Sequence, residues 1–450
     1  MRKSAAAIVV GLALAACGGD PQSAQEAAAP TSVGETAAVS DPVVVETTDL
    51  DFIGESFVKL ALALGEHDAD FVDAYHGPPE WEATARQEQR ALDLLETDAE
   101  ALLINAARAN ADQPSVRGAM LEKLIRAALT RIQMARGDVF SFNEETRLLY
   151  DAVAPDYDLA DFDEALAEID ALLPGEGPLN ERVDAFRNSL AIPADRLRAV
   201  FDAAIAECRR RTLQHYALPE DERFRLEIVT DKPWSGYNWY QGDYESLIQV
   251  NTDFPIIIDR AVDLGCHEGY PGHHTWNVML ERDLLGDAGW IEYSVYPLFS
   301  PLSVIAEGSA NYGIELAFPG DEKIAFERET LFPLAGLDQA DAQTLDRLNK
   351  IRRRLSHARN HIAREYLDGR ITRDEAVEML MTYNLQSRER AGQGVRFIET
   401  YRGYVLNYNL GRDLVAAYVK RGADDNNDEW AVFERLLSTP LAASDLAAGQ

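Results

Sequence analysis

Apolar residues recur at three- and four-residue intervals along most of the chain, with charged residues between them. The pattern is clearest in residues 57–64, 101–108, 120–134 and 161–173. This spacing places the apolar side chains on one face of an α-helix. Clusters of proline and glycine at residues 77–79 and 174–178 separate the helical segments. We therefore expect a mainly α-helical protein whose first half is a helical scaffold.

A different pattern begins after about residue 222. Segments 224–229 and 244–251 are rich in aromatic and β-branched residues, and they either alternate or run apolar. Such segments are typical of β-strands. We expect a small antiparallel sheet or hairpin here, before helices resume near residue 254. Segment 244–251 would then be a candidate edge strand for pairing with an extended peptide.

The N-terminus changes how the rest of the chain is interpreted. Residues 1–3 are basic, residues 5–16 form a short apolar run, and Cys17 follows. This is the layout of a secretory signal peptide, and its end resembles the lipobox of bacterial lipoproteins. The resemblance implies a signal peptide at 1–16 and a lipid on Cys17. The alternative is an ordinary signal followed by an incidental cysteine.

The lipoprotein resemblance also implies a location and a domain plan. Gly18 after the cysteine favours the periplasmic face of the bacterial outer membrane rather than the inner membrane. Residues 17–47 are rich in small residues and proline, so we expect a flexible tether. Residues 48–450 would form the α-rich domain, with the scaffold at about 48–220 and a catalytic half at about 221–450.

The net charge restricts the classes of binding partner, and the cysteine content determines whether a disulfide can form. The chain has 76 Asp and Glu against 43 Lys and Arg, a formal net charge of −33. Such a surface repels phosphate backbones, which excludes nucleic acid as a partner, and it leaves the lipid as the membrane anchor. Cys208 and Cys266 lie in a compartment that permits disulfides. They either pair or remain two buried free thiols, and the oligomeric state is not fixed by the sequence.

The candidate chemistry is concentrated in residues 266–274, which read Cys-His-Glu-Gly-Tyr-Pro-Gly-His-His. Two histidines and an adjacent glutamate are a common arrangement in zinc hydrolases, where Glu268 would be the general base. On an unbroken helix, His273 would be rotated by about 240° from His267, and His274 would lie about 10 Å further along. An interruption at Pro271–Gly272 would bring the second histidine back toward the metal.

A third ligand is expected from another segment. Residues 300–313 read as an apolar helix with Glu307 as its one acidic residue. Burial of such a carboxylate is unfavourable unless it meets a charge or a metal, although a salt bridge to an arginine is the alternative. The small residues 308–310 would let this helix pack closely against another. Arginines 352–354 form either a solvated helix face or a position for a substrate carboxylate.

These motifs resemble the family called domain of unknown function 885. The resemblance rests on His-Glu-x-x-Pro-Gly-His-His at 267–274, Glu-Gly-x-Ala-x-Tyr at 307–312, and weaker similarity at 371–376 and 402–411. It covers roughly residues 50–450. It implies a large helical zincin-like fold of the gluzincin type, with a small antiparallel β element before the active-site helix. The chain departs from the family pattern at Arg402 and Tyr404, which replace a proline and a glutamine.

The same resemblance implies the site. One zinc ion per chain would be bound by His267, Glu307 and either His273 or His274, with Glu268 as general base. Tyr408 would stabilise the oxyanion, with Tyr401, Tyr404 and His361 as further candidates and simple core packing as its alternative role.

The sequence therefore predicts a lipid-anchored periplasmic zinc peptidase, which hydrolyses peptide bonds by Glu-assisted attack of a zinc-bound water. Two alternatives remain open. One is a zinc amidase or esterase acting on cell-wall fragments or small esters, and the other is a non-catalytic, metal-stabilised binding lipoprotein. Preference for internal or terminal bonds does not follow from the sequence.

Overall fold

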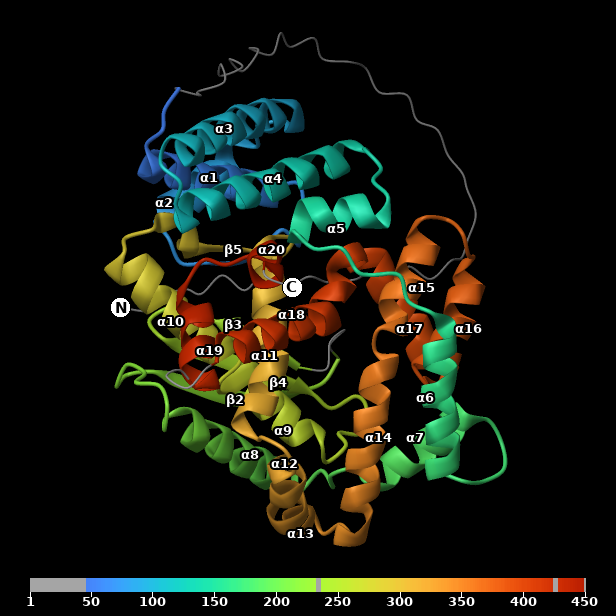
Figure 1. Cartoon of the computed structure of the whole chain (residues 1–450). Helices are drawn as coiled ribbons and strands as arrows, with labels where there is room; N and C mark the ends of the chain where they lie inside the picture. The colour runs from blue at the N-terminus through green and yellow to red at the C-terminus, as the bar shows by residue number, and fades with distance from the viewer. Residues whose placement is uncertain (1–45, 232–235, 424–427, 449–450) are drawn as a thin grey trace, which may run out of the picture. The chain divides into compact units, whose positions relative to one another are not determined.

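Helices make up most of the computed structural model, which describes residues 46–231, 236–423 and 428–448 (Figure 1). The prediction of a mainly α-helical protein with small β elements is thus confirmed. The predicted signal peptide, Cys17 and residues 18–45 of the predicted tether lie outside the described residues. Within the described ranges, none of the helices combines the length and apolar character needed to span a bilayer.

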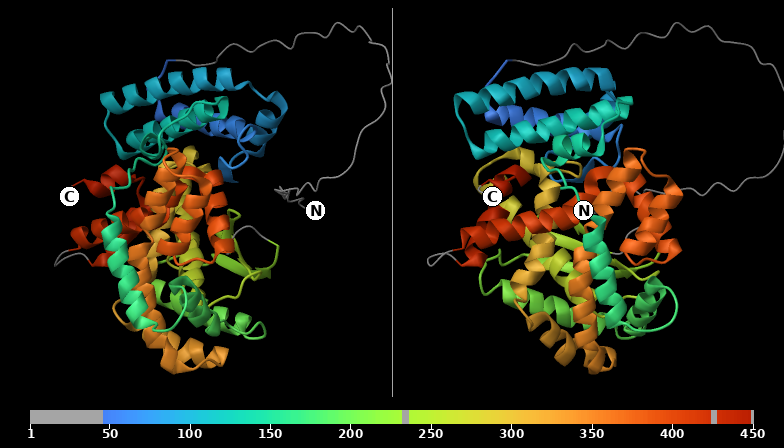
Figure 2. Two further views of the ribbon diagram at one scale, coloured as in Figure 1. Left: turned by 90° about the vertical axis from the view of Figure 1, so that its right-hand side faces the viewer. Right: turned by 45° about the vertical axis from the view of Figure 1, so that its right-hand side comes forward.

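The first helices follow the predicted apolar segments and are stacked together in both views of Figure 2. Their bounds are α1 (Leu50–Gly65), α2 (Pro79–Glu88), α3 (Leu92–Asp112), α4 (Val116–Arg136) and α5 (Phe142–Tyr150). Local polar residues set where they start. The Asp49 side chain accepts a hydrogen bond from the Asp51 amide at the start of α1, and Ser141 with Glu144 forms a capping box at α5.

The helices on the other side of the candidate site pack around a second and a third apolar cluster. They are α6 (Leu159–Leu172), α7 (Leu179–Ser189), α8 (Leu197–Thr212), α12 (Glu322–Phe326), α13 (Phe332–Ala335), α14 (Ala342–Leu355), α15 (Ala358–Leu367), α16 (Arg373–Tyr383) and α17 (Arg388–Tyr401). Two short turns accompany them, η4 (Glu327–Leu331) and η5 (Gln339–Asp341). The fully buried Leu348 and Ile362 show how α14 and α15 each contribute an apolar face to the third cluster.

The remaining helices and turns include those that carry the candidate site residues. They are α9 (Arg260–Leu264), η1 (Gly265–Gly269), α10 (His273–Met279), η2 (Leu280–Asp287), η3 (Ile291–Ser294), α11 (Pro301–Ala317), η6 (Arg402–Val405), α18 (Leu406–Gly422), α19 (Glu429–Ser438) and α20 (Ala443–Ala447). Figure 1 shows α11 and α18 side by side in the middle of the described chain.

Small residues allow α11 and α18 to approach closely, as the sequence of residues 308–310 predicts. An added Cβ on Gly308 would lie 2.6 Å from the backbone carbonyl of Gly411, and one on Gly411 would lie 2.7 Å from the carbonyl oxygen of Val304. No side chain fits at either position without displacing backbone. The contact sets the distance between Glu307 on α11 and the tyrosines at the start of α18.

The β structure differs from the predicted antiparallel element. The strands are β1 (Val72–Tyr75), β2 (Arg223–Val229), β3 (Gly236–Tyr240), β4 (Glu245–Asn251) and β5 (Val295–Pro297). One sheet has the order β2-β4-β3, in which β3 is antiparallel to β4 but β2 is parallel to it. A separate antiparallel pair joins β1 to β5.

Two predictions about these strands were wrong: β2 and β4 are parallel and not antiparallel, and β4 is not an edge strand. The sequence analysis did not predict β3, which pairs with one side of β4 and leaves only the other side for β2. Strand β4 is therefore central and cannot add a peptide as an edge strand, whereas β3 is at an edge. Alternate residues of β4, from Ser246 to Val250, are buried against the helices that carry the candidate site.

Cys208 on α8 and Cys266 on η1 form a disulfide, with Cα atoms 5.5 Å apart. This resolves the alternatives that the sequence left open. Both cysteines are fully buried in the second apolar cluster. The bond fixes η1 to α8 at the residue directly before His267.

We expect the double substitution Cys208→Ala with Cys266→Ala to lower the free energy of unfolding by about 4 kcal/mol. The cysteines are 58 residues apart in sequence, and opening a loop of that length increases the entropy of the unfolded chain by about this amount. Urea unfolding of the oxidised soluble domain, compared with the double variant, measures the difference. A loss below about 1 kcal/mol would show that the disulfide contributes little to stability.

Candidate metal centre

The helix that carries the histidine motif is interrupted at the predicted position. The π-helical turn η1 ends at Gly269, and α10 begins at His273. Gly272 lies against the preceding turn so closely that an added Cβ would be 1.9 Å from the carbonyl oxygen of His267. Only glycine fits there. The interruption brings the His267 and His273 rings together, with their centroids 4.7 Å apart.

Glu307 enters this pair from α11. Its Oε2 lies 3.3 Å from Nε2 of His267 and 3.8 Å from Nε2 of His273. The same oxygen is buried and accepts no hydrogen bond of normal geometry. A buried carboxylate oxygen without a hydrogen bond lowers the stability of the fold unless a donor or a cation binds to it. Two imidazole nitrogens and one carboxylate oxygen thus face a common point.

Glu268 borders the same point. One ligand atom each from His267, Glu268 and His273 lies within 4.8 Å of the others. The Glu268 side chain is 6% exposed and forms no hydrogen bond or ion pair with the described residues. Burial raises its pKa, and the charge of Glu307 adds to the effect, while His267 opposes it. The backbone at Glu268 is held by β3, since Asn238 Nδ2 donates to the Glu268 carbonyl oxygen at 2.8 Å.

The charges of the cluster fit a divalent cation. Burial lowers the pKa of His273 to about 4, and the neighbouring His267 lowers it further, so this imidazole is neutral at physiological pH. Neutral imidazoles and carboxylates are the ligand types that zinc takes in proteins. A cation at this point would also neutralise the buried carboxylates of Glu268 and Glu307, with which no lysine or arginine in the described part of the chain forms an ion pair. The residues present therefore fit a zinc ion.

Two tyrosines complete the wall of the site from α18 and the turn before it. The Tyr404 hydroxyl donates to Oε1 of Glu307 at 2.9 Å, which holds the carboxylate from the side away from the histidines. The Tyr408 hydroxyl makes no hydrogen bond with the described residues. Burial raises the pKa of Tyr408, and the charges of Glu307 and Glu268 raise it further. Its phenol is therefore a protonated donor at neutral pH, close to both carboxylates.

His274 does not join the cluster, which corrects its prediction as a possible metal ligand. It follows His273 on α10 and is thus rotated by about 100° around the helix. Its Nε2 lies 2.9 Å from Oε2 of Glu222, and its Nδ1 lies 2.8 Å from Oγ of Ser246. Both ring nitrogens are occupied and the residue is fully buried. His274 anchors α10 through a different face of the helix from the one that carries His273.

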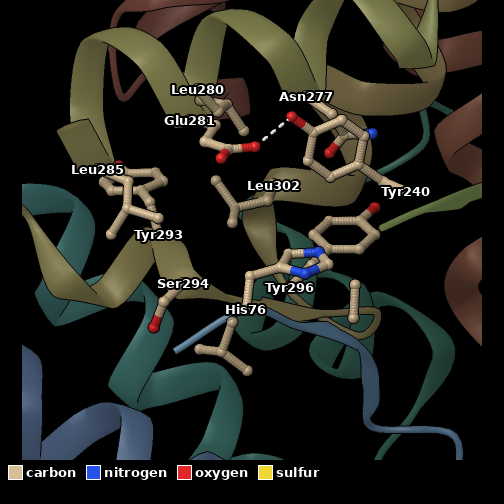
Figure 3. A pocket seen from close by; sticks show the side chains of 12 residues that line it. His76, Tyr240, Asn277, Leu280, Glu281, Leu285, Tyr293, Ser294, Tyr296 and Leu302 are labelled. Atoms are coloured by element: carbon tan, nitrogen blue, oxygen red, sulfur yellow. Dashed lines mark hydrogen bonds between the residues drawn. The ribbon is translucent and has the colours of Figure 1, made fainter. Parts of the chain in front are cut away.

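A small cavity between α10, η2 and β5 is lined by none of the cluster residues and is too small for a substrate. Its volume is about 30 Å³, which is room for little more than one water molecule. Figure 3 shows His76, Tyr240 and Glu281 around it, with a hydrogen bond from the Tyr240 hydroxyl to Glu281. Tyr296 also lines this cavity, and its hydroxyl bonds with Oγ of Ser303 at 2.9 Å.

Two acidic residues near the site wall, Asp70 and Asp73, were not predicted from the sequence. Asp73, on the unpredicted strand β1, accepts a hydrogen bond from the Tyr237 hydroxyl. Burial raises the pKa of Asp73 to about 6, and the charges of Glu307 and Asp70 contribute. The sequence offered one indication of them, which is the group of acidic residues Asp68, Asp70 and Asp73 in a predicted helical scaffold without other candidate catalytic residues. That signal does not distinguish a surface loop from a site.

Comparisons with known proteins give the fold but no family. No family model matches the chain, and no curated protein matches it. The crystal structure of a predicted lipoprotein from Colwellia psychrerythraea aligns with a TM-score of 0.52 and 14% identity, over 91% of this chain and 76% of that one. At this identity the likeness shows the fold alone.

Two further structures align with lower scores. A predicted lipoprotein of unknown function from Shewanella oneidensis has a TM-score of 0.45 and 14% identity, over 82% of this chain and 74% of that one. An M32 carboxypeptidase from Deinococcus radiodurans R1 has a TM-score of 0.34 and 13% identity, over 86% and 88%. Neither score is high enough to support an argument about this chain.

We expect about one zinc ion per wild-type chain, and a loss of zinc affinity of at least 100-fold in His267→Ala, His273→Ala and Glu307→Ala. Each substitution removes one ligand atom from the common point. Elemental analysis after dialysis against buffered zinc measures the content, and a competing chelator gives the affinity.

Two variants serve as controls for the zinc experiment. His361→Ala removes a partly buried histidine outside the cluster, and His274→Gln removes the anchor of α10. Both should keep zinc when folded. Loss of zinc from folded His274→Gln with retention in His273→Ala would reverse the assignment of the second histidine.

We expect the Glu222 network behind α10 to make stability fall in acid. Hydrogen bonds from Tyr270 and Arg209 and the charge of His274 overcome the effect of burial and lower the pKa of Glu222 to about 2. A carboxyl with a depressed folded-state pKa contributes stability above its unfolded value of 4.5, and that contribution is lost as pH falls toward 2. Urea unfolding between pH 7 and pH 3 measures the trend.

The matched variant for this experiment is Glu222→Gln. It should lose about 3 kcal/mol at pH 7, because buried partners are left unpaired, and it should show a flatter pH dependence below pH 4.5. Glu55→Gln, which removes an exposed pair with Lys59, should change stability by less than about 1 kcal/mol. Equal acid slopes in wild type and Glu222→Gln would contradict the role of the network.

Proposed function

We propose that this chain is a zinc-dependent peptidase of the domain of unknown function 885 family, with a helical zincin-like fold. The observation that carries the proposal is the convergence of His267, His273 and Glu307 on one point, with the unpaired carboxylate of Glu268 beside it. We further propose that a lipid on Cys17 holds the enzyme at the periplasmic face of the outer membrane.

The metal would be held by His267, His273 and Glu307. When bound, zinc polarises a carbonyl group and makes water more acidic, which is the chemistry that amide hydrolysis needs. Tyr404 keeps the Glu307 carboxylate in position through its hydrogen bond to Oε1. Such outer contacts orient ligands and tune their basicity.

Glu268 would act as the general base and then as the acid. Its buried carboxylate, with a raised pKa, is suited to accept a proton from the attacking water. The oxygen of that water bonds to the carbonyl carbon, the C–N bond breaks, and Glu268 delivers the proton to the leaving amine. The protonated Tyr408 hydroxyl, which has no partner among the described residues, would donate to the oxygen that becomes negative.

We expect Glu268→Gln to lower kcat by more than about 100-fold while zinc content stays at about one per chain. The amide keeps the size of the side chain but cannot accept the proton. Hydrolysis is measured by mass spectrometry on pools of short peptides, muropeptides and esters, which also separates a peptidase from an amidase or esterase. Glu55→Gln is the matched control and should retain full activity.

Two outcomes would contradict the proposed mechanism. If Glu268→Gln hydrolyses the pools as fast as wild type, Glu268 is not the base. If zinc-loaded wild type hydrolyses none of the pools, the chain is a metal-stabilised binding protein instead.

A further inference from the structure

Arg359 on α15 is a cation without a partner near the metal cluster. Its side chain is partly buried and makes no hydrogen bond or ion pair within residues 46–231, 236–423 and 428–448. Burial lowers the pKa of its guanidinium. On the same helix, Arg364 shows the usual arrangement, with bonds to Asp156 and to two backbone carbonyls. In a chain with 76 acidic residues, an unpaired and partly desolvated guanidinium needs an explanation.

Hydrogen bonds fix Arg359 beside the wall of the site. Asn360 Nδ2 donates to Oδ1 of Asn409 at 2.8 Å, and Asn409 Nδ2 donates to the Ser356 carbonyl oxygen at 2.9 Å. The first bond joins the first turn of α15 to the first turn of α18, and the second joins α18 to the C-cap of α14. Arg359 and Tyr408 each precede one of the bonded asparagines. The Arg359 charge accordingly acts on Tyr408, as do the charges of Glu268 and Glu307.

The chemistry of the guanidinium selects the ligand. Its planar fork binds a carboxylate through two parallel hydrogen bonds, and such bonds are strong where water is excluded. Another part of the site wall is negatively charged, because the charges of Asp70 and Asp73 both raise the pKa of Tyr401 there. An anion is repelled there. Arg359 is thus a position in the described site wall that favours a substrate carboxylate.

Arginines 352–354, which the sequence pattern indicated, do not serve this purpose. Arg352 is partly buried, and the charges that act on it are those of Arg187, Asp259, Asp184 and Arg390, none of which belongs to the metal cluster. Arg353 pairs with Glu315, and Arg354 pairs with Glu168, and both side chains are about half exposed. Arg353 and Arg354 thus form a solvated, ion-paired helix face. Arg359 lies one helix further on and was not singled out by the sequence pattern.

We propose that Arg359 binds the free α-carboxylate of a peptide substrate, so that the enzyme removes the C-terminal residue from short peptides. This inference rests on the proposed peptidase function. A carboxylate bound to Arg359 would place the last peptide bond of the substrate toward Tyr408, on which the Arg359 charge acts. Water adds across that bond, and the products are a shortened peptide with a new carboxylate and a free amino acid.

The test compares acid and amide ends without requiring turnover. Calorimetry measures binding of matched peptide pools, one with free C-terminal carboxylates and one with C-terminal amides, to Glu268→Gln protein. We expect the acid pool to bind at least about 10-fold more tightly than the amide pool. Arg359→Ala in the same background should remove this preference, and Arg359→Lys should keep part of it. Arg354→Ala is the matched surface control and should keep it in full.

The same pools applied to wild type give a second readout that needs no variant. We expect release of single C-terminal amino acids from the acid pool and at least about 10-fold slower cleavage of the amide pool. Equal binding of both pools, or an unchanged preference in folded Arg359→Ala, would overturn the inference. Internal cleavage of both pools at equal rates would also overturn it while leaving the peptidase function intact. If neither pool is hydrolysed but acid binding depends on Arg359, the carboxylate site stands and the peptidase function fails.

Discussion

Backbone contact between α11 and α18 is the constraint on which the site depends. Gly308 and Gly411 let the two helices meet without side chains between them. The contact lies one residue after Glu307 and three residues after Tyr408, so it fixes the distance between the third ligand and the tyrosine wall. Any side chain at either glycine would separate Tyr404 from Glu307, whose hydrogen bond is 2.9 Å long. The geometry of the carboxylate is therefore a consequence of helix packing.

A second backbone contact sets the histidines. Gly272 packs on the carbonyl oxygens of Cys266 and His267, and this turns the chain between η1 and α10. Residues six apart can then share one point, which they cannot do on a regular helix. Preorganisation of this kind avoids rearrangement when a metal binds. Both glycine contacts use the absence of a side chain to bring chemically active neighbours together.

The sequence was sufficient where local chemistry decides the structure and insufficient where distant segments decide it. The break at Pro271–Gly272 and the isolated acidic Glu307 could be recognised because each depends on its own neighbours. The choice between His273 and His274 could not, since it depends on the rotation of α10 and on Glu222, some fifty residues away. The parallel pairing of β2 with β4 depends on β3, whose strand character was not recognised. Arg359 is distinguished by having no partner among the residues that the structure describes, and only a folded chain can show this.

The two faces of α10 explain why a fully polar network is buried behind a metal site. His273 faces the cluster, while His274 faces Glu222, which also bonds with Tyr270 and Arg209. The disulfide of Cys266 adds a covalent link on the same side. Because these contacts hold η1 and α10 from behind, the front face can keep Glu268 and Glu307 buried although no lysine or arginine of the described residues pairs with them. Buried carboxylates without partners are unfavourable in a flexible chain, and the rigid rear face is what allows the fold to retain them for a cation.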